Sequence, residues 1–210
     1  MGAAFEGRIL TTIMNQEFGT DESIRFAEKI IEILDEGRFS STYKLAVLLA
    51  LMDLCFEKNV ASGMAPDSVT TRQLAEKIIE IYWPHTIDYP RTSGTLRQNS
   101  GKQAEIPAAI LSFRRDIARD PSIQLHRAKT GFADGYERLV RSVEWTLIEM
   151  PLPKLQTVGP SRTPFLYEIS WDESVRRGDL RREFDNNIRL KPGAGDRLIQ
   201  LNGLLRPFIQ

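Results

Sequence analysis

Apolar residues recur every three or four positions in six stretches of the chain, which is the spacing that places them on one face of an α-helix. The second stretch, STYKLAVLLALMDLCFEKN, is apolar on most sides, so we expect it to be the buried central helix. The predicted helices cover residues 21–36, 41–59, 70–83, 103–118, 134–150 and 195–210.

The third predicted helix, TTRQLAEKIIEIYWPH, has clear start and stop signals. Thr70 and Gln73 have the spacing of a capping box, in which each side chain binds the other residue's backbone N–H. Pro84 ends the helix, because the residue before a proline is driven out of the α region. The helix also fits the second helix of a helix-turn-helix, and Tyr82 and Trp83 are predicted to fix the following loop rather than to stack on bases.

Two stretches near the C-terminus alternate apolar and polar residues, which is typical of β-strands. They are TPFLYEISW at residues 163–171 and NNIRLKPG at residues 186–193, and the polar link between them is compatible with a helical turn or a mobile excursion. A flexible loop, VASGMAPDS, is predicted after the second helix. The fold class is therefore mainly α (α+β): a multi-helix bundle with a helix-turn-helix-like core and a small two-stranded β-hairpin.

A chain of 210 residues suits one domain or a tightly packed pair. We expect an N-terminal helical segment over residues 1–38, a helical core over 39–150, and the β-hairpin with a C-terminal helix over 151–210, packed together as one domain. The last stretch, LIQLNGLLRPFIQ, is apolar to its end. Its large side chains cannot all face one narrow core stripe, so some are expected to be exposed or covered by another chain or a following module.

Composition excludes several classes of protein. The 28 basic and 28 acidic residues balance, so net charge gives no general attraction to nucleic acid or membrane. The longest apolar run, residues 45–52, is far shorter than the roughly 20 residues of a membrane span. The single cysteine, Cys55, rules out a disulfide within the chain, favours a cytosolic setting and is predicted to be a small buried hydrophobe.

Catalytic and metal-binding patterns are weak. The two histidines, His85 and His126, have no metal-ligand spacing to each other or to the cysteine, and we predict no cofactor and no metal site in this chain. Asp172 and Glu173 follow a predicted strand, as magnesium ligands in nucleases can, but a solvated strand end explains them better. SGTLRQNSGK lacks the ending of a phosphate-binding P-loop.

The basic residues carry the stronger hypothesis. Residues 88–129 hold 8 basic and 4 acidic side chains, a net charge of +4, and a second basic group follows at 176–182. Clustered arginines can neutralise phosphates, although interleaved acids also fit a solvated face with ion pairs. The candidate nucleic-acid-binding residues are Arg91, Arg97, Lys102, Arg114, Arg115, Arg119, Arg127, Lys129, Arg176, Arg177, Arg181 and Arg182.

Several motifs resemble a known family. STYKLAVLLALMDLCFE, TTRQLAEKIIEIYWPHTIDY and TLRQNSGKQAEIPAAILSF are similar, in that order, to the helical N-terminal region of bacterial HNH endonuclease-family proteins. FLYEISW and IRLKPGAGDRLIQLNGLLRPFIQ resemble the end of the same region, so the resemblance runs from about Phe39 to the C-terminus. The HNH module itself, with its catalytic histidine and its metal, is absent from this chain, and no catalytic residue is carried over.

The resemblance implies a non-catalytic N-terminal recognition or assembly domain of an HNH-type nuclease, in restriction or phage defence. DNA is then a candidate partner, together with another protein chain or a C-terminal nuclease module, and the chain alone is not expected to be an enzyme. Two alternatives remain open: a winged-helix DNA-binding regulator, and a pure protein-interaction module. Salt-dependent binding to duplex DNA separates the last of these from the other two.

Overall fold

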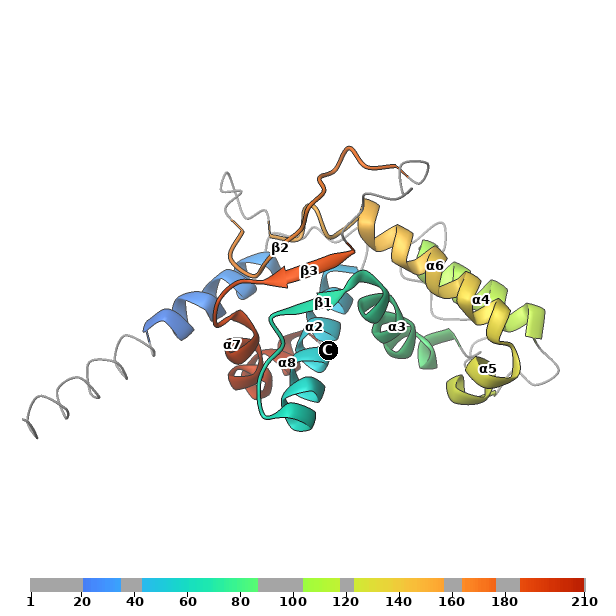
Figure 1. The fold of residues 1–210 in the computed structure, drawn as a ribbon, viewed down its shortest axis with the longest axis horizontal. Helices are drawn as coiled ribbons and strands as arrows, with labels where there is room; N and C mark the ends of the chain where they lie inside the picture. Colours follow the sequence, from blue (N-terminus) through green and yellow to red (C-terminus); the bar gives the residue numbers. More distant parts are fainter. Residues whose placement is uncertain are drawn as a thin grey trace, which may run out of the picture.

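Helices dominate the structure, a computed structural model that describes residues 21–34, 43–86, 104–117, 123–156, 164–176 and 186–209 (Figure 1). This confirms the predicted mainly α, α+β class. After a helical segment at 21–34, the elements are α2 (Tyr43–Ser62), β1 (Ser68–Thr70), α3 (Thr71–Tyr82), the 3-10 turn η1 (Pro84–Thr86), α4 (Glu105–Ile117), α5 (Leu125–Gly131), α6 (Ala133–Glu149), β2 (Tyr167–Glu168), β3 (Asn187–Leu190), α7 (Ala194–Gln200) and α8 (Asn202–Ile209).

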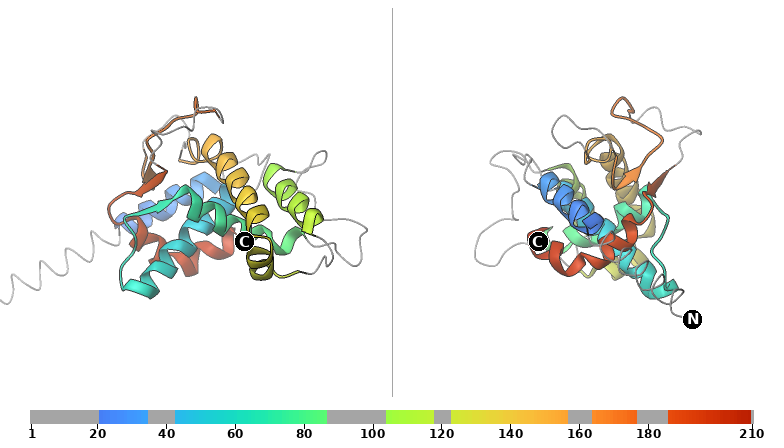
Figure 2. Two further views of the ribbon diagram at one scale, coloured as in Figure 1. Left: turned by 45° about the vertical axis from the view of Figure 1, so that its right-hand side comes forward. Right: turned by 90° about the vertical axis from the view of Figure 1, so that its left-hand side faces the viewer.

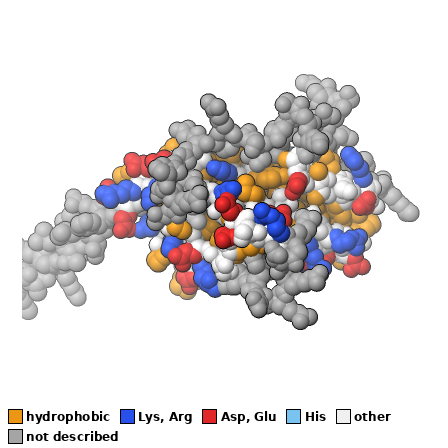
Figure 3. Space-filling view, turned by 90° about the horizontal axis from the view of Figure 1, so that it is seen from above, with side chains coloured by type: hydrophobic (Ala, Val, Ile, Leu, Met, Phe, Trp, Pro, Cys, Tyr) orange, Lys and Arg blue, Asp and Glu red, His pale blue; other side chains and the backbone are white. Residues whose placement is uncertain are grey.

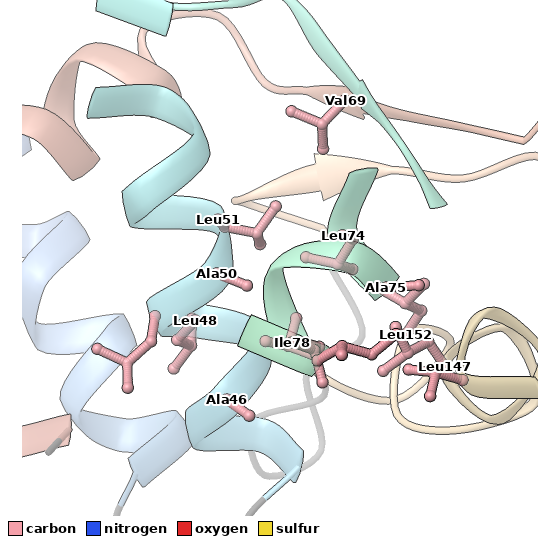
Figure 4. Close-up of a cluster of buried hydrophobic side chains, with 14 of the residues drawn as sticks. Ala46, Leu48, Ala50, Leu51, Val69, Leu74, Ala75, Ile78, Leu147 and Leu152 are labelled. Atoms are coloured by element: carbon pink, nitrogen blue, oxygen red, sulfur yellow. The ribbon is translucent and has the colours of Figure 1, made fainter. Parts of the chain in front are cut away.

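The core forms where α2, α3 and α6 meet. Leu51 of α2, Leu74 and Ile78 of α3 and Leu147 of α6 point toward one another and are fully buried (Figure 4). Every side chain from Ala46 to Met52 is buried, as the all-round apolar character of this helix predicts. Cys55 is likewise buried within α2, in agreement with its predicted role as a small hydrophobe.

The sheet has three strands rather than the predicted two. β2 and β3 pair antiparallel as expected, but β1 pairs with the other edge of β3, giving the order β1-β3-β2. β1 begins at Ser68, the last residue of the segment predicted to be a flexible loop, and runs to Thr70, where the third helix was predicted to begin. The alternation signal failed there because only three residues are extended, and only Val69 is buried.

The junction of β1 and α3 was predicted well. Thr70 caps α3: its hydroxyl accepts from the Gln73 backbone N–H at 3.1 Å, and the Gln73 side chain accepts from the Thr70 N–H at 2.8 Å. Thr71 then ties the helix start to two distant elements. Its N–H donates to the carbonyl of Asn186, and its hydroxyl donates to Glu144 of α6 at 2.5 Å. The start of α3 is therefore fixed to both the sheet and α6.

α6 lies between α3 and α4. Thr71 at the start of α3 contacts Glu144 near the end of α6, and Glu80 near the end of α3 contacts Lys129 just before α6, so α3 and α6 run antiparallel. On its other side, Thr146 of α6 donates to Glu105 at the start of α4. α5, immediately before α6, was not predicted as a separate helix.

The C-terminal segment packs back on α2 and on the first helical segment. Figure 2 shows α7 and α8 beside α2 and the first helical segment. Arg206 of α8 donates to Asp53 of α2 at 2.5 Å, and Arg197 of α7 pairs with Glu22. The final predicted helix is divided at Leu201 into α7 and α8. Within α8, Leu204 is 54% exposed and Leu205 is buried, which confirms that the apolar end does not bury all of its side chains in one stripe.

Candidate nucleic-acid interface

The predicted basic residues do not form one patch in the described part of the chain. Arg114 and Arg115 lie on α4, Arg127 and Lys129 on α5, and Arg176 follows β2. The other predicted contacts lie outside the described residues: Arg91, Arg97, Lys102, Arg119, Arg177, Arg181 and Arg182.

Arg114 differs most from its predicted place on a surface. It is only 6% exposed, and its guanidinium lies over the Trp83 ring, 3.8 Å from the ring centroid. Its Nε donates to Thr86 Oγ1 at 2.9 Å and its Nη2 donates to the Trp83 carbonyl at 3.0 Å. Burial lowers the pKa of Arg114. The side chain fastens α4 to the end of α3 and is enclosed where a phosphate would have to reach it, so we withdraw it from the candidate contacts.

Lys129 also has a partner inside the fold. Its Nζ pairs with Glu80 at 3.1 Å and lies 5.3 Å from the centroid of the Tyr136 ring. Burial by itself would lower the pKa of Lys129, but the hydrogen bond to Glu80 and the interactions with Tyr136 together more than offset it, and the pKa is raised. Lys129 thus joins α5 to α3, and its charge is already matched.

The remaining described candidates are exposed. Arg115 and Arg127 lie on the outer faces of α4 and α5. Arg176 is exposed too, and its Nη1 donates to the carbonyls of Glu173 and Val175 at 2.8 and 2.9 Å. These three arginines could contact phosphates from separate positions around the molecule.

A pair of arginines between α3 and α6 was missed by sequence reasoning. Arg72 of α3 makes a bidentate ion pair with Glu137 of α6, with distances of 2.9 and 2.6 Å, and its Nε lies 3.3 Å from Glu76. Arg141 donates through Nε to the same Glu137 carboxylate at 3.1 Å. Hydrogen bonding from Arg72, assisted by Arg141, lowers the pKa of Glu137 to about 2. The Glu137–Arg141 spacing was visible in the sequence, but the contact with Arg72, 65 positions away, was not.

Arg141 belongs to an exposed stripe on α6. Asp134, Arg138 and Arg141 recur at positions i, i+4 and i+7, and all three are exposed. On the side of the molecule seen in Figure 3, the described Lys and Arg side chains are interleaved with Asp and Glu and with hydrophobic groups, and they form no continuous basic patch among the coloured residues. Any contact with DNA on this side would therefore depend on individual arginines.

A groove of about 670 Å³ runs beside this stripe, between α4 and the α5–α6 turn. Its walls mix apolar side chains, among them Phe113 and Phe132, with Asp116, Asp134 and Arg138. The two helices approach closely here, because a Cβ on Gly135 would lie 2.9 Å from the Phe113 ring. The groove brings charges of both signs to one edge of α6 and so favours no single class of ligand.

The aromatic residues at the end of α3 are not a surface platform. Tyr82 and Trp83 are 4% and 6% exposed, and the Trp83 indole N–H donates to the Ile123 carbonyl at 3.2 Å. Their predicted role in fixing neighbouring structure is thereby supported, and stacking on bases would require this core to open. Asp172 accepts hydrogen bonds from Ser174, as a solvated strand end does.

Two further features of the described ranges bear on function. No three His, Cys, Asp or Glu side chains within them come close enough together to bind a metal ion. None of the helices in the same ranges combines the length and the hydropathy that a membrane-spanning segment needs.

The arrangement defines a helix-rich α+β domain with a small antiparallel sheet and arginines exposed on α6. The chain belongs to the family described as Domain of unknown function (DUF8808), whose model matches residues 23–183. The match includes α2 to α6 and β2, and therefore Arg72, Glu137 and Arg141. Comparisons with curated proteins and with solved structures gave no match.

Proposed function

We propose that this chain is a DNA-recognition domain that serves as the non-catalytic recognition and assembly part of an HNH-type nuclease. The association with HNH-type nucleases, and with restriction or phage defence, rests on the motif resemblance of the helices and of the C-terminal segment. The DNA-recognition role rests on the order of the elements and on the arginines that α6 exposes.

The order of the elements is the observation that carries the proposal. A helix, a short strand and a second helix, α2–β1–α3, are followed later by a helix that leads into two antiparallel strands, and β1 pairs with the last strand. Winged-helix domains have the same order, and the helix that precedes their hairpin is the one that enters the major groove. α6 occupies that position in the chain.

Two differences from a compact winged helix limit what the analogy supplies. α4 and α5 are inserted before α6, and α3 and α6 run antiparallel instead of crossing steeply. A shared order of elements does not by itself imply a shared function. The exposed side chains of α6 therefore have to supply the chemistry, and Arg138 and Arg141 are the cations that this helix presents.

The experiment is a titration of fluorescein-labelled duplex DNA with the full chain at several salt concentrations. We expect the double variant Arg138→Ala/Arg141→Ala to bind at least about tenfold more weakly and to reduce the salt slope by at least about 1, since each lost phosphate contact removes roughly 0.9. Arg25→Ala, at an equally exposed arginine in an i,i+4 ion pair on another helix, is the control. Equal binding by the double variant and the control would contradict the role of α6.

Arg115, Arg127 and Arg176 are proposed as flanking phosphate contacts. Each is exposed, and none lies on the α6 stripe. Replacing one of them with Ala should weaken binding uniformly across DNA sequences and lower the salt slope by about 1. An unchanged slope would remove that arginine from the interface.

A protein-interaction module is the second candidate function, favoured by an apolar stripe at the end of α2. Phe56 and Val60 lie one turn apart on α2, and Met64 follows the helix after Gly63; they are 47%, 71% and 71% exposed. A second copy of the chain is the partner that can be tested directly. If the stripe is an interface, the mass measured by light scattering rises with protein concentration, and Val60→Asp keeps the chain monomeric. A monomeric wild-type chain would exclude this self-association.

A further inference from the structure

Building on the proposed function, we infer that Arg141 reads a guanine base in the DNA major groove, and that Glu137 is the positioning residue that holds its guanidinium for this contact. The inference names one base and one side chain within the proposed interface. It rests on the way in which three charged residues of α3 and α6 share their hydrogen bonds.

Arg141 is restrained and exposed at the same time. Its side chain is 72% exposed, and its Nε donates to Glu137 Oε1 at 3.1 Å. Within the described residues, its Nη1 and Nη2 groups have no hydrogen-bond partner. One edge of the guanidinium is therefore held against the protein while its terminal N–H groups remain available to a ligand.

Glu137 can hold Arg141 because Arg72 holds Glu137. The bidentate contact with Arg72 fixes both carboxylate oxygens, and Arg72 is itself steadied by Glu76 at 3.3 Å. The Glu137 side chain is 35% exposed, which is less than either arginine. Arg72 of α3 thus fixes the orientation of the carboxylate, and the carboxylate in turn restrains the guanidinium of Arg141 through the Nε hydrogen bond.

The free edge of such an arginine matches guanine. Two parallel N–H groups bind the O6 and N7 acceptors of guanine, and this pairing is the commonest base-specific contact in the major groove. Flexible arginines lose rotamer freedom when they bind, so an arginine that is already restrained loses less. A phosphate could also accept from Arg141, but phosphate binding would give no preference for any base.

Two other exposed arginines provide comparisons with Arg141: Arg138 on the same helix and Arg25 on the first helical segment. Arg138, the other exposed arginine of the stripe, has no ion-pair partner among the described residues and is not held in one orientation. Arg25 forms an i,i+4 pair with Asp21 at 2.8 Å and is as exposed as Arg141, at 72%. Asp21 is 59% exposed and binds no second arginine of the described ranges, so Arg25 reproduces the local ion pair without the anchor.

The test selects bound duplexes from a randomised pool with the full wild-type chain and sequences them, then measures affinities for the selected duplex. At one position we expect wild-type protein to prefer guanine by between about fivefold and about 100-fold. Arg141→Ala should abolish that preference, and Glu137→Gln should reduce it, while Arg25→Ala leaves it unchanged. Replacing the guanine with 7-deazaguanine, which lacks the N7 acceptor, should weaken wild-type binding and leave Arg141→Ala unaffected.

The outcomes separate this inference from the proposed function. DNA binding with no guanine preference that depends on Arg141, or equal sensitivity of wild type and Arg141→Ala to 7-deazaguanine, would overturn the inference and leave the proposed function standing. A wild-type chain that binds no duplex DNA even at low salt would overturn both. Circular dichroism of each variant shows whether an affinity change reflects unfolding, and Arg141→Lys, which keeps the charge but loses the two-pronged donor, should still lose the preference for guanine.

Discussion

Replacing Arg114 should destabilise the fold far more than replacing its neighbour. Arg114→Ala removes two hydrogen bonds from a charged donor, to Thr86 and to the Trp83 carbonyl, and the stacking of the guanidinium on the Trp83 ring. Hydrogen bonds that involve a charged group contribute about 1.5–3 kcal/mol each. The contact between cation and ring adds about 1 kcal/mol.

Two effects reduce this sum. Thr86 Oγ1 donates to the Trp83 carbonyl at 2.8 Å, so both former acceptors keep a hydrogen bond when Arg114 is removed. Deleting the cation also removes the cost of burying its charge, which is the cause of its lowered pKa. We therefore expect a net loss of about 3 kcal/mol in the free energy of unfolding for Arg114→Ala. Arg114→Met, which keeps an apolar stem over Trp83, should lose only about 1–2 kcal/mol.

The assay is urea denaturation followed by tryptophan fluorescence and by circular dichroism. Arg115→Ala is the matched control, because Arg115 is the next residue of α4 and is exposed. Its stability should stay within about 0.5 kcal/mol of wild type. Equal stabilities of the two alanine variants, with weaker DNA binding by Arg114→Ala, would refute the buried role and return Arg114 to the surface contacts.

Three further predictions concern chemistry. Purified chain should leave plasmid DNA intact in the presence of magnesium, manganese or zinc, and cleavage that disappears on changing Asp172 would contradict this. Burial, with a smaller contribution from Asp196, raises the pKa of Cys55 to about 12, so a thiol reagent at neutral pH should label it only in denaturant, and rapid labelling of the folded chain would be inconsistent with this burial. The pKa of Glu137 is lowered from 4.5 to about 2, so its ion pair stabilises the fold fully above about pH 4.5, and this stabilisation is lost as the pH falls toward 2. Glu137→Gln should remove this change of unfolding free energy with pH, which amounts to at most about 1 kcal/mol because the pair is partly exposed. If the variant kept the wild-type dependence of stability on pH, Glu137 would not be its source.

Much of the fold could be predicted from local signals. The capping box at Thr70 and Gln73 gave the start of α3, because its contacts lie within one turn of the helix. α3 ends just before Pro84 as predicted, but not for the predicted reason: Trp83 keeps α-helical dihedrals, φ −54° and ψ −45°, and the chain continues into the 3-10 turn Pro84–Thr86. β1 could not be predicted in the same way. Its three residues are extended because β3, more than a hundred positions later, pairs with them, and so short a segment carries no alternation of its own.

The candidate site was less predictable than the fold. Counting basic residues along the chain selected Arg114, which packs inside, and Lys129, which is paired with Glu80. The same count passed over Arg72 and Arg141, since neither lies in a run of basic residues and each has a glutamate, Glu76 or Glu137, four positions away. Exposure and pairing depend on which helices lie side by side, and charge density along the chain does not contain that information.

The balanced surface also constrains how this domain could recognise DNA. A protein with equal numbers of basic and acidic residues, interleaved on the face seen in Figure 3, gains from the release of counterions only at the few exposed arginines that reach phosphates. Its affinity for arbitrary DNA should be weak, so discrimination has to come from a few oriented donors such as Arg141 rather than from attraction to the backbone. Weak binding by one domain suits an assembly in which a tethered partner adds its own contacts, because a linked second site raises the overall affinity without any new contact here. A recognition and assembly role is therefore easier to reconcile with this surface than the role of a stand-alone regulator.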